Sequence, residues 1–219
     1  MCNNSKVKLA IFDNDMTLVD SSRAILEGFN QVADKVGRPR TNLKRVMECI
    51  AMPLPEFCRG LLGAYQPEWV EMYLQNSPQN ETEYLTPFED SAKALEILKS
   101  HGVKIAMASN RENPEPVLKR TGLIKYFDDY IGAKAPHGKL NYKPEPDMLL
   151  KLLELFNLEA DNAVYIGDSD LDAKTAHNAG MRFIGVPRGY FQAESLLKFG
   201  AWRVINNSLL ELEDILVNN

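Results

Sequence analysis

The stretch Lys8-Leu-Ala-Ile-Phe-Asp13-Asn-Asp15-Met-Thr17-Leu-Val-Asp20-Ser21 decides the fold of this chain. Its apolar run, Leu9 to Phe12, ends at two aspartates that are separated by one residue. A bounded apolar run of this length favours a buried parallel strand over a helix. Because alternate residues of an extended chain point the same way, we expect Asp13 and Asp15 to face one volume beyond the strand's carboxyl end. Open α/β sheets bind their ligands at this edge.

Two carboxylates so close to each other repel unless a cation joins them or one of them takes a proton. Mg2+, which prefers oxygen ligands and keeps some of its water, is the cation we expect. A carboxylate can also accept a phosphoryl group as a nucleophile. Taken alone, an Asp-x-Asp pair more often marks a polar turn after a strand, so the rest of the chain has to decide between these interpretations.

Composition restricts the class of protein. The 219 residues carry a formal net charge of −5, which argues against a general nucleic-acid binder. No apolar run is long enough to span a membrane, and the first residues do not resemble a signal peptide. Cys2, Cys49 and Cys58 form no paired framework. We therefore expect a cytoplasmic protein without nucleic-acid or membrane partners. A monomer or a homodimer is expected, a choice that the sequence leaves open.

The chain alternates predicted strands and helices. After the first strand, further strands are expected at Val103–Ala108, Tyr130–Ile131, Ala163–Ile166, Arg182–Val186 and Trp202–Ile205. This alternation predicts an α/β fold with a doubly wound parallel sheet of the Rossmann-like kind. Residues 18–85 are instead expected to be helical throughout, the last helix running from Pro67 to Gln75. The predicted domains are an α/β core, residues 1–17 and 86–219, and a small all-α bundle, residues 18–85.

Polar side chains follow three of the predicted strands. Asp13 and Asp15 follow the first, Ser109 and Asn110 the second, and Asp168 a later one, while Lys143 precedes a helix. Carboxyl ends of parallel strands meet at one edge of the sheet, so these groups are expected to converge. Together they supply an acceptor, positive charge for the equatorial oxygens and a proton donor, as phosphoryl transfer requires.

Four segments in this order resemble the motifs of the haloacid dehalogenase superfamily of aspartate-nucleophile phosphohydrolases. The DxDxT motif is similar to Asp13–Thr17, the strand-end Ser or Thr to Ser109, the Lys before Pro to Lys143, and GDSxxD to Gly167–Asp172. Within this superfamily, the chain resembles the branch that contains phosphoglycolate phosphatases and β-phosphoglucomutases. The helical insertion resembles that branch's bundle cap, which closes over the site and excludes water.

The resemblance implies a role for each motif residue. Asp13 is the nucleophile that forms an aspartyl-phosphate, and Asp15 protonates the leaving alcohol and then activates water. Ser109, Asn110 and Lys143 bind the phosphoryl group, with Ser109 and Lys143 also counted as catalytic. Mg2+ is held by Asp13, Asp168 and the backbone carbonyl of Asp15, with Asp172 supporting the ion or its water. The acid at position 15 favours phosphate esters over halides, since a departing halide needs no proton.

Several points stay open at this level. Met16 stands where the phosphoglycolate phosphatases usually have glycine, which permits a positive φ. Asn14 is polar where an apolar residue is common, Thr17 is expected to support Asp15, and Lys139 rivals Lys143. The resulting hypothesis is a Mg2+-dependent phosphatase acting on a small phosphorylated metabolite, such as phosphoglycolate or a sugar phosphate. The alternatives are a hexose-phosphate mutase of the β-phosphoglucomutase type and a catalytically silent binding module.

Overall fold

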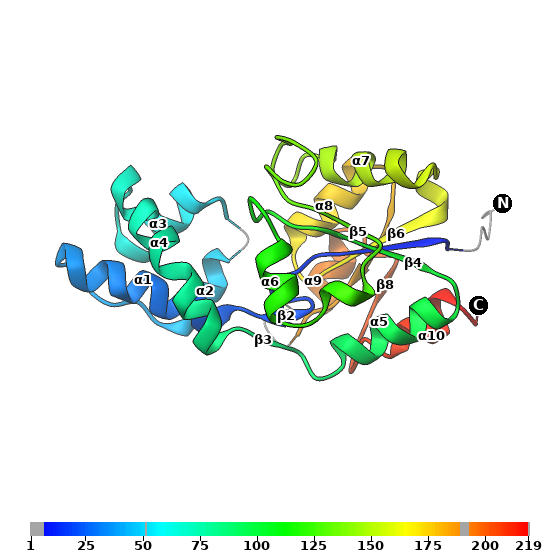
Figure 1. Cartoon of the computed structure of the whole chain (residues 1–219), viewed down its shortest axis with the longest axis horizontal. Helices are drawn as coiled ribbons and strands as arrows, with labels where there is room; N and C mark the ends of the chain where they lie inside the picture. Colours follow the sequence, from blue (N-terminus) through cyan, green and yellow to red (C-terminus); the bar gives the residue numbers. More distant parts are fainter. Residues whose placement is uncertain (1–6, 51, 189–192, 219) are drawn as a thin grey trace. The chain divides into compact units, whose positions relative to one another are not determined.

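A six-stranded parallel sheet forms the centre of the larger part of the chain (Figure 1). The computed structural model describes residues 7–50, 52–188 and 193–218. The strand order is β5-β4-β1-β6-β7-β8, with the first strand in the middle of the sheet. This arrangement confirms the predicted α/β fold with a Rossmann-like parallel sheet. The strands are β1 (Leu9–Phe12), β4 (Lys104–Ala108), β5 (Asp129–Ile131), β6 (Ala163–Gly167), β7 (Arg182–Gly185) and β8 (Arg203–Val204).

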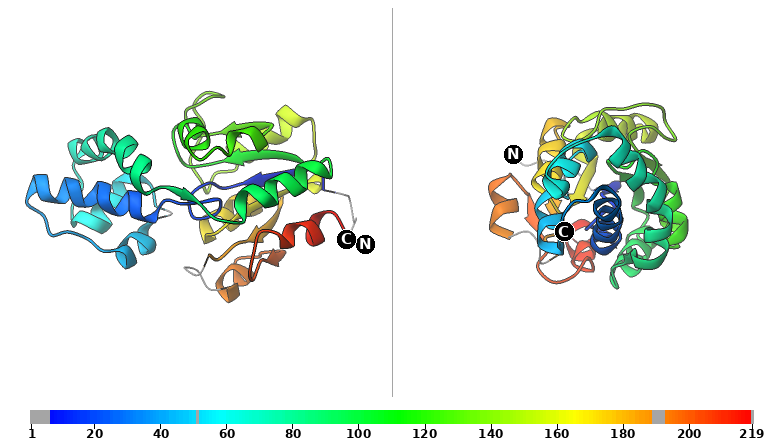
Figure 2. Two further views of the ribbon diagram at one scale, coloured as in Figure 1. Left: turned by 60° about the horizontal axis from the view of Figure 1, so that its bottom comes forward. Right: turned by 90° about the vertical axis from the view of Figure 1, so that its left-hand side faces the viewer.

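Helices cover both faces of this sheet (Figure 2). Leu9 and Ile11 of β1 pack in one apolar cluster with residues of α7, α8 and α9. Ala10 and Phe12 point to the opposite face and are also fully buried. Burial on both faces explains why the strand reads as an unbroken apolar run. The helices of this part are α5 (Ser91–Ser100), α6 (Glu115–Arg120), α7 (Asp147–Phe156), α8 (Asp170–Asn178), α9 (Ala193–Lys198) and α10 (Glu211–Leu216), with short 3-10 turns at Ile124–Tyr126 and Ala160–Asn162.

The chain divides into two compact units, one made of residues 1–19 and 87–219 and the other of Asp20–Thr86. The second unit contains four helices and an apolar core of its own. Phe29 lies at the centre of that core, stacked on Tyr73 at 4.4 Å and tilted against Phe57 at 5.0 Å between ring centroids. Its helices are α1 (Ser22–Val36), α2 (Leu43–Cys49), α3 (Leu54–Leu62) and α4 (Pro67–Tyr84).

Helix α4 is longer than the sequence predicted, because it continues through Pro78 to Tyr84 instead of ending at Gln75. A proline inside a helix removes one helical hydrogen bond, so Pro78 lowers the local preference for helix in this segment. The side-chain amides of Gln31 and Asn80 exchange two hydrogen bonds, of 3.0 and 3.1 Å, between α1 and α4. This tertiary pairing stabilises the last turns of α4 and outweighs the local cost of Pro78.

Two short strands were not predicted. β2 (Val19–Asp20) pairs with β3 (Thr86–Pro87) where the chain passes between the two units. The prediction of helix throughout residues 18–85 was therefore wrong at Val19–Asp20. A two-residue strand is too short to show the alternating pattern from which strands are predicted. Among the described residues, no helix is both long and apolar enough to cross a membrane.

Arg188 joins three separate segments of the larger unit. Its guanidinium donates two hydrogen bonds to the Asp90 carboxylate, at 2.9 and 3.0 Å, and two to the Thr17 carbonyl oxygen. Asp90 also accepts from the Ser208 hydroxyl at 3.0 Å and the Leu209 N–H at 2.8 Å. Burial opposes ionisation of Asp90, but these donors outweigh it and hold the Asp90 pKa below its ordinary value of 3.8. The network fixes the start of α5 against the loop that follows β1.

This network predicts a pH-dependent loss of stability in the Asp90→Asn variant. A carboxyl whose pKa is lowered by folding stabilises the fold fully above its unfolded pKa, and that contribution is lost as the pH falls through the folded pKa. We expect Asp90→Asn to lower the free energy of unfolding by about 1–3 kcal/mol between pH 6 and 8. The difference from the unsubstituted protein should shrink below about pH 4. Urea unfolding across this pH range measures both effects.

Asp34→Asn is the matched control, because Asp34 is exposed and lies 4.0 Å from its nearest cationic partner, Arg40. Its free energy of unfolding should change by less than about 0.5 kcal/mol at every pH. A constant difference between Asp90→Asn and the unsubstituted protein down to pH 3 would contradict the assignment.

Candidate active site

A tight turn follows β1 and sets the direction of both motif aspartates. The Asp13 N–H donates to the Ile166 carbonyl at 2.8 Å, so Asp13 lies just beyond the paired part of the strand. The carbonyl of Asn14 accepts from the N–H groups of Leu18 and Val19. Met16 has a φ of 59° and is fully buried. The turn thus imposes the left-handed conformation that glycine adopts more easily, and packing around Met16 maintains it.

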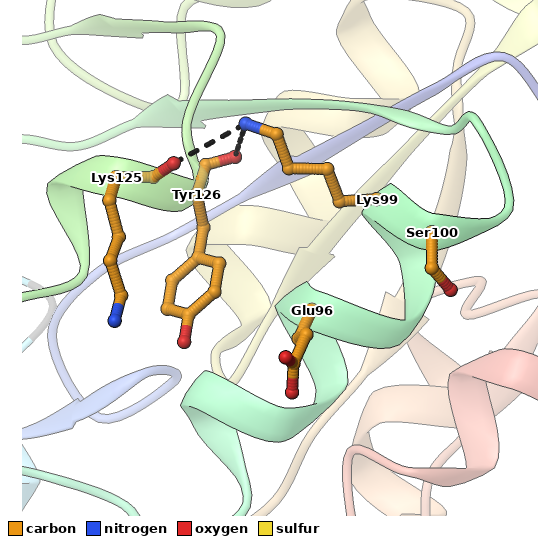
Figure 3. Close-up of a pocket in the computed structure, with 5 residues that line it drawn as sticks. All are labelled: Glu96, Lys99, Ser100, Lys125 and Tyr126. Atoms are coloured by element: carbon orange, nitrogen blue, oxygen red, sulfur yellow. Dashed lines mark hydrogen bonds between the residues drawn. The ribbon is translucent and has the colours of Figure 1, made fainter.

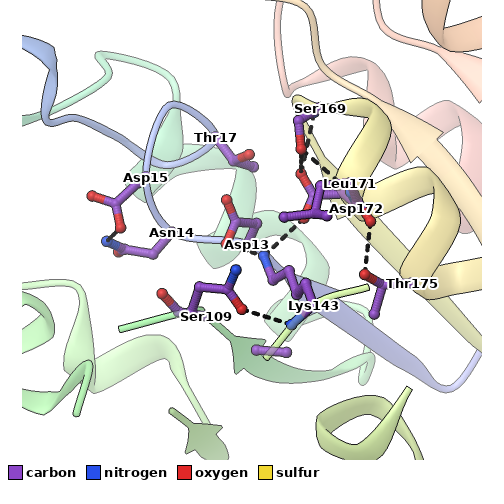
Figure 4. A network of polar contacts seen from close by, with 12 residues as sticks. Asp13, Asn14, Asp15, Thr17, Ser109, Lys143, Ser169, Leu171, Asp172 and Thr175 are labelled. Atoms are coloured by element: carbon purple, nitrogen blue, oxygen red, sulfur yellow. Dashed lines mark hydrogen bonds and ion pairs between the residues drawn. The ribbon is translucent and has the colours of Figure 1, made fainter. Parts of the chain in front are cut away.

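Lys143 contacts two carboxylates from distant parts of the chain (Figure 4). Its Nζ lies 2.6 Å from Oδ1 of Asp13 and 2.8 Å from Oδ1 of Asp172. All three residues are buried. Burial favours the neutral amine, but the two carboxylates outweigh it and raise the pKa of Lys143. Lys143 is therefore an ammonium held beside the first motif aspartate, whereas its rival Lys139 is exposed.

Asp172 is held by its own helix and by the sheet. Its Oδ2 accepts hydrogen bonds from the Ser169 N–H and hydroxyl, at 3.1 and 2.6 Å, completing a capping box at the start of α8. The Tyr165 hydroxyl lies 3.0 Å from its Oδ1. A Cβ on Gly167 would lie within 2.7 Å of the Asp172 side chain, so this approach requires glycine. The Tyr165 hydroxyl also lies 3.1 Å from the Ala108 carbonyl oxygen, which competes for its one proton. The two Ser169 donors fix the Asp172 carboxylate, and its Oδ1 faces the Lys143 ammonium.

Asp168 lies at the carboxyl end of β6 and is also buried. Its Oδ1 accepts from the Thr17 hydroxyl at 3.3 Å. Burial and the charges of Asp172 and Asp13 raise its pKa well above 3.8, opposed by Lys143 and the Thr17 hydrogen bond. Burial likewise raises the pKa of Asp13 to about 7, with Lys143 opposing the shift and the charges of Asp172 and Asp15 adding to it. Neither carboxyl is stabilised as an anion by its protein surroundings alone.

The arrangement of three buried carboxylates fits a site for a cation. Asp13, Asp168 and Asp172 each offer an oxygen, and these oxygens all lie within 4.8 Å of one another. The Lys143 ammonium contacts two of these three buried carboxylates, those of Asp13 and Asp172. A divalent cation would balance the remaining negative charge, and carboxylate oxygens are the ligands that Mg2+ prefers. The residues present therefore fit a bound metal ion.

Ser109 and Asn110 lie at the end of β4, next to the cluster. The Asn110 side-chain oxygen accepts from the backbone N–H of Lys143 at 2.8 Å. Ser109 is buried, and its hydroxyl oxygen accepts from the Arg111 N–H at 3.2 Å. Asn110 thus positions Lys143, while the Ser109 hydroxyl retains its own proton to donate.

Asp15 has partners that the sequence did not predict. Arg111 donates to both carboxylate oxygens, from Nε at 2.8 Å and Nη2 at 2.7 Å. The Asn14 amide donates to Oδ2 at 3.3 Å. Thr17 was expected to support Asp15, but its single hydroxyl proton is directed at Asp168. The prediction about Thr17 was wrong because it considered only sequence neighbours.

Tyr165 and Arg111 were missed by the sequence analysis. Tyr165 is a fully buried aromatic residue in an apolar strand, two positions before Gly167, and its polar end alone hinted at a buried partner. Arg111 follows directly after the second motif, where its charge could have been matched to the excess of carboxylates. The sequence shows that both residues are present, but it does not show which groups lie within hydrogen-bonding distance of them.

A surface hollow elsewhere shows none of this chemistry (Figure 3). It is lined by Glu96, Lys99, Ser100, Lys125 and Tyr126. The Lys99 ammonium there donates to the backbone carbonyls of Lys125 and Tyr126. None of the motif residues lines this hollow, and Lys99 has a structural partner, so we assign it no role.

Known proteins similar to this chain include phosphatases. A phosphoglycolate phosphatase from Rhodobacter capsulatus is 30% identical over 82% of this chain and 84% of its own length. A phosphorylated carbohydrates phosphatase from Thermotoga maritima is 29% identical over 89% of this chain and 92% of its own. A solved structure from Bacteroides fragilis, described as a haloacid dehalogenase-like hydrolase, superposes with a TM-score of 0.83 at 28% identity, covering 94% and 100% of the two chains.

The family match covers the strands and loops that form the site. The model of the haloacid dehalogenase-like hydrolase family matches residues 10–186, which include all of β1 except Leu9, the whole of β4 and β6, and every residue of the buried cluster. The fold, the order of the motifs and the buried carboxylates agree with this match. The chain belongs to the haloacid dehalogenase-like hydrolase family.

Proposed function

We propose that this chain is a Mg2+-dependent phosphatase that hydrolyses a small phosphorylated metabolite through an aspartyl-phosphate intermediate. The substrate class we propose is phosphoglycolate or a sugar phosphate, the class to which the names of the two phosphatase relatives point. The observation that carries the proposal is the buried contact of 2.6 Å between Lys143 and Asp13, beside two further buried carboxylates.

Asp13 is the proposed nucleophile. Its carboxylate attacks phosphorus, a bond forms between an Asp13 oxygen and phosphorus, and the bond from phosphorus to the leaving oxygen breaks. Asp15 gives a proton to that leaving oxygen. In the second half-reaction Asp15 takes a proton from water, the water oxygen attacks phosphorus, and inorganic phosphate and free Asp13 are regenerated.

The remaining residues stabilise charge. Lys143 lies beside the nucleophile as a fixed ammonium, ready to neutralise the equatorial phosphoryl oxygens. The Ser109 hydroxyl donates to one of those oxygens, and Asn110 keeps the Lys143 backbone in place. Asp13 and Asp168 would hold the metal ion, with Asp172 supporting it indirectly through Lys143. The ion would supply Lewis-acid charge stabilisation at the phosphoryl group.

We also propose that the protein acts in the cytoplasm, as a monomer or homodimer. Cys49 and Cys58 are buried and unpaired, as is usual where thiols stay reduced. The helical unit of residues 20–86 would serve as the cap that encloses the bound substrate, by analogy with the family.

A panel of phosphorylated metabolites, assayed for phosphate release with and without Mg2+, tests the proposed function directly. Release of phosphate from 2-phosphoglycolate or a hexose phosphate supports a phosphatase. Conversion of a hexose phosphate to its isomer without phosphate release would instead support the mutase alternative. The absence of both products from every substrate would contradict the proposal.

Asp13→Asn is expected to lower the rate of phosphate release by roughly four orders of magnitude or more, because the amide cannot replace the nucleophilic carboxylate. The variant should remain folded, since Lys143 keeps Asp172 as a charged partner and the amide has nearly the same shape as the carboxylate. Steady-state turnover on the best substrate, together with a thermal melt, measures both. Asp34→Asn, on an exposed residue, is the control that should keep full activity. Retention of activity by Asp13→Asn would exclude the covalent mechanism.

Removal of divalent ions with EDTA should abolish phosphate release, and added Mg2+ should restore it. Asp168→Asn removes one proposed ligand, so the Mg2+ concentration for half-maximal activity should rise by at least about tenfold. A Mg2+ titration of both proteins measures the shift. Glu154→Gln, on a side chain that is 70% exposed, should leave the titration unchanged. An unaltered Mg2+ requirement in Asp168→Asn would contradict this ligand assignment.

A further inference from the structure

Arg111, which lies outside the four motifs, and Asn14, at the variable second position of the first motif, contact the Asp15 carboxylate. Arg111 contacts both of its oxygens, at 2.7 and 2.8 Å, and the Asn14 amide adds a third hydrogen bond at 3.3 Å. Figure 4 shows Asp15 beside Asn14, apart from the contacts of Lys143 with Asp13. A bidentate guanidinium contact fixes the plane of a carboxylate as well as its position. These two neighbours therefore contribute to the orientation of Asp15.

Both neighbours are themselves anchored. The Arg111 N–H donates to the Ser109 hydroxyl at 3.2 Å, and the Arg111 carbonyl accepts from the Ala133 N–H at 2.8 Å. A Cβ on Gly132 would lie 2.5 Å from that carbonyl oxygen, which shows how closely the two segments pack. Asn14 is fully buried, with its backbone carbonyl inside the turn after β1. Donors on such fixed backbone are organised before any substrate arrives.

An ion pair at a partly exposed position usually contributes little to stability, and the Arg111 and Asp15 side chains are 22% and 23% exposed. If the pair had only a structural role, removing it would therefore change the free energy of unfolding only slightly. Its contact with the proposed acid, next to the second motif, gives it a place in the reaction.

We infer that Arg111 and Asn14 are positioning residues that orient Asp15 for proton transfer to the leaving group. This inference rests on the proposed phosphatase function. As the bond from phosphorus to the leaving oxygen breaks, its electron pair stays on that oxygen, which takes the proton of Asp15. Asp15 regains a proton from water in the second half-reaction. A guanidinium bound to both oxygens favours the ionised carboxylate, which is the form that Asp15 takes as its proton passes to the leaving oxygen. Arg111 and Asn14 hold the group in place during that transfer.

Substrates that differ only in their leaving group test this inference. The leaving oxygen of phenyl phosphate becomes strongly basic and needs a proton to depart as phenol. The leaving oxygen of 2,4-dinitrophenyl phosphate departs as a phenolate anion that is stable without a proton. The parameter to compare is kcat/KM, because it includes steps only up to departure of the leaving group. Arg111→Ala should lower kcat/KM by about 100-fold with phenyl phosphate but less than about threefold with the dinitrophenyl ester. Asp15→Asn should show the same pattern.

Asn14→Leu provides a second, independent variant, since it removes one donor and keeps a buried side chain of similar size. It should lower kcat/KM by about tenfold, again only with phenyl phosphate. Arg111→Lys should recover part of the activity lost in Arg111→Ala, because a point charge replaces the fork. Arg203→Ala, on an exposed arginine, is the control for loss of a guanidinium and should leave both substrates unaffected.

Equal losses on both esters in Arg111→Ala would overturn the inference, since they would indicate contact with the phosphoryl group or damage to the fold. Unchanged kcat/KM on phenyl phosphate in both Arg111→Ala and Asn14→Leu would overturn it as well. Failure of the proposed function has a different signature. In that case neither ester is hydrolysed by the unsubstituted protein, or Asp13→Asn hydrolyses both at the full rate.

Discussion

The site depends on the ion pairs that the Lys143 ammonium forms with the carboxylates of Asp13 and Asp172. Lys143 lies 2.6 and 2.8 Å from the two carboxylates, with all three side chains almost fully removed from solvent. Removing one partner of a buried ion pair leaves an uncompensated charge and destabilises a protein by about 3–5 kcal/mol. The other polar contacts around the cluster hold Asp13, Lys143 and Asp172 in place, so that the positive charge of Lys143 stays paired.

The scaffold supplies these contacts from separate elements. Asn110 at the end of β4 holds the Lys143 backbone, while Ser169 and Tyr165 hold Asp172. The absence of a side chain at Gly167 lets Asp172 approach the end of β6. Parallel strands bring all these groups to one edge of the sheet. The same arrangement gathers three buried carboxylates around the ammonium of Lys143, which leaves an excess of negative charge. A divalent cation would balance this excess at the place where the proposed phosphoryl transfer occurs.

The fold and the grouping of the motif residues could be anticipated from local patterns. Apolar runs of four or five residues identified β1, β4, β6 and β7 within one or two positions. The part of helix α4 beyond Gln75, the strands β2 and β3 and the six-residue α9 were not predicted, because tertiary pairing stabilises them or because they are too short to show a period. The predicted helix and strand boundaries were therefore inaccurate where the local sequence preference was weak or where tertiary contacts overrode it.

The sequence by itself determined the family, the parallel α/β core and the kinds of group at the site, because these depend on residue type and order along the chain. Only the tertiary structure decided which partner each group takes. It selected Lys143 over Lys139, directed the Thr17 hydroxyl to Asp168, and paired Arg111 with Asp15. The physical reason is that a hydrogen bond or ion pair depends on distances of about 3 Å between atoms. Thr17 and Asp168, which are 151 positions apart, meet at 3.3 Å, and no spacing along the sequence specifies that distance.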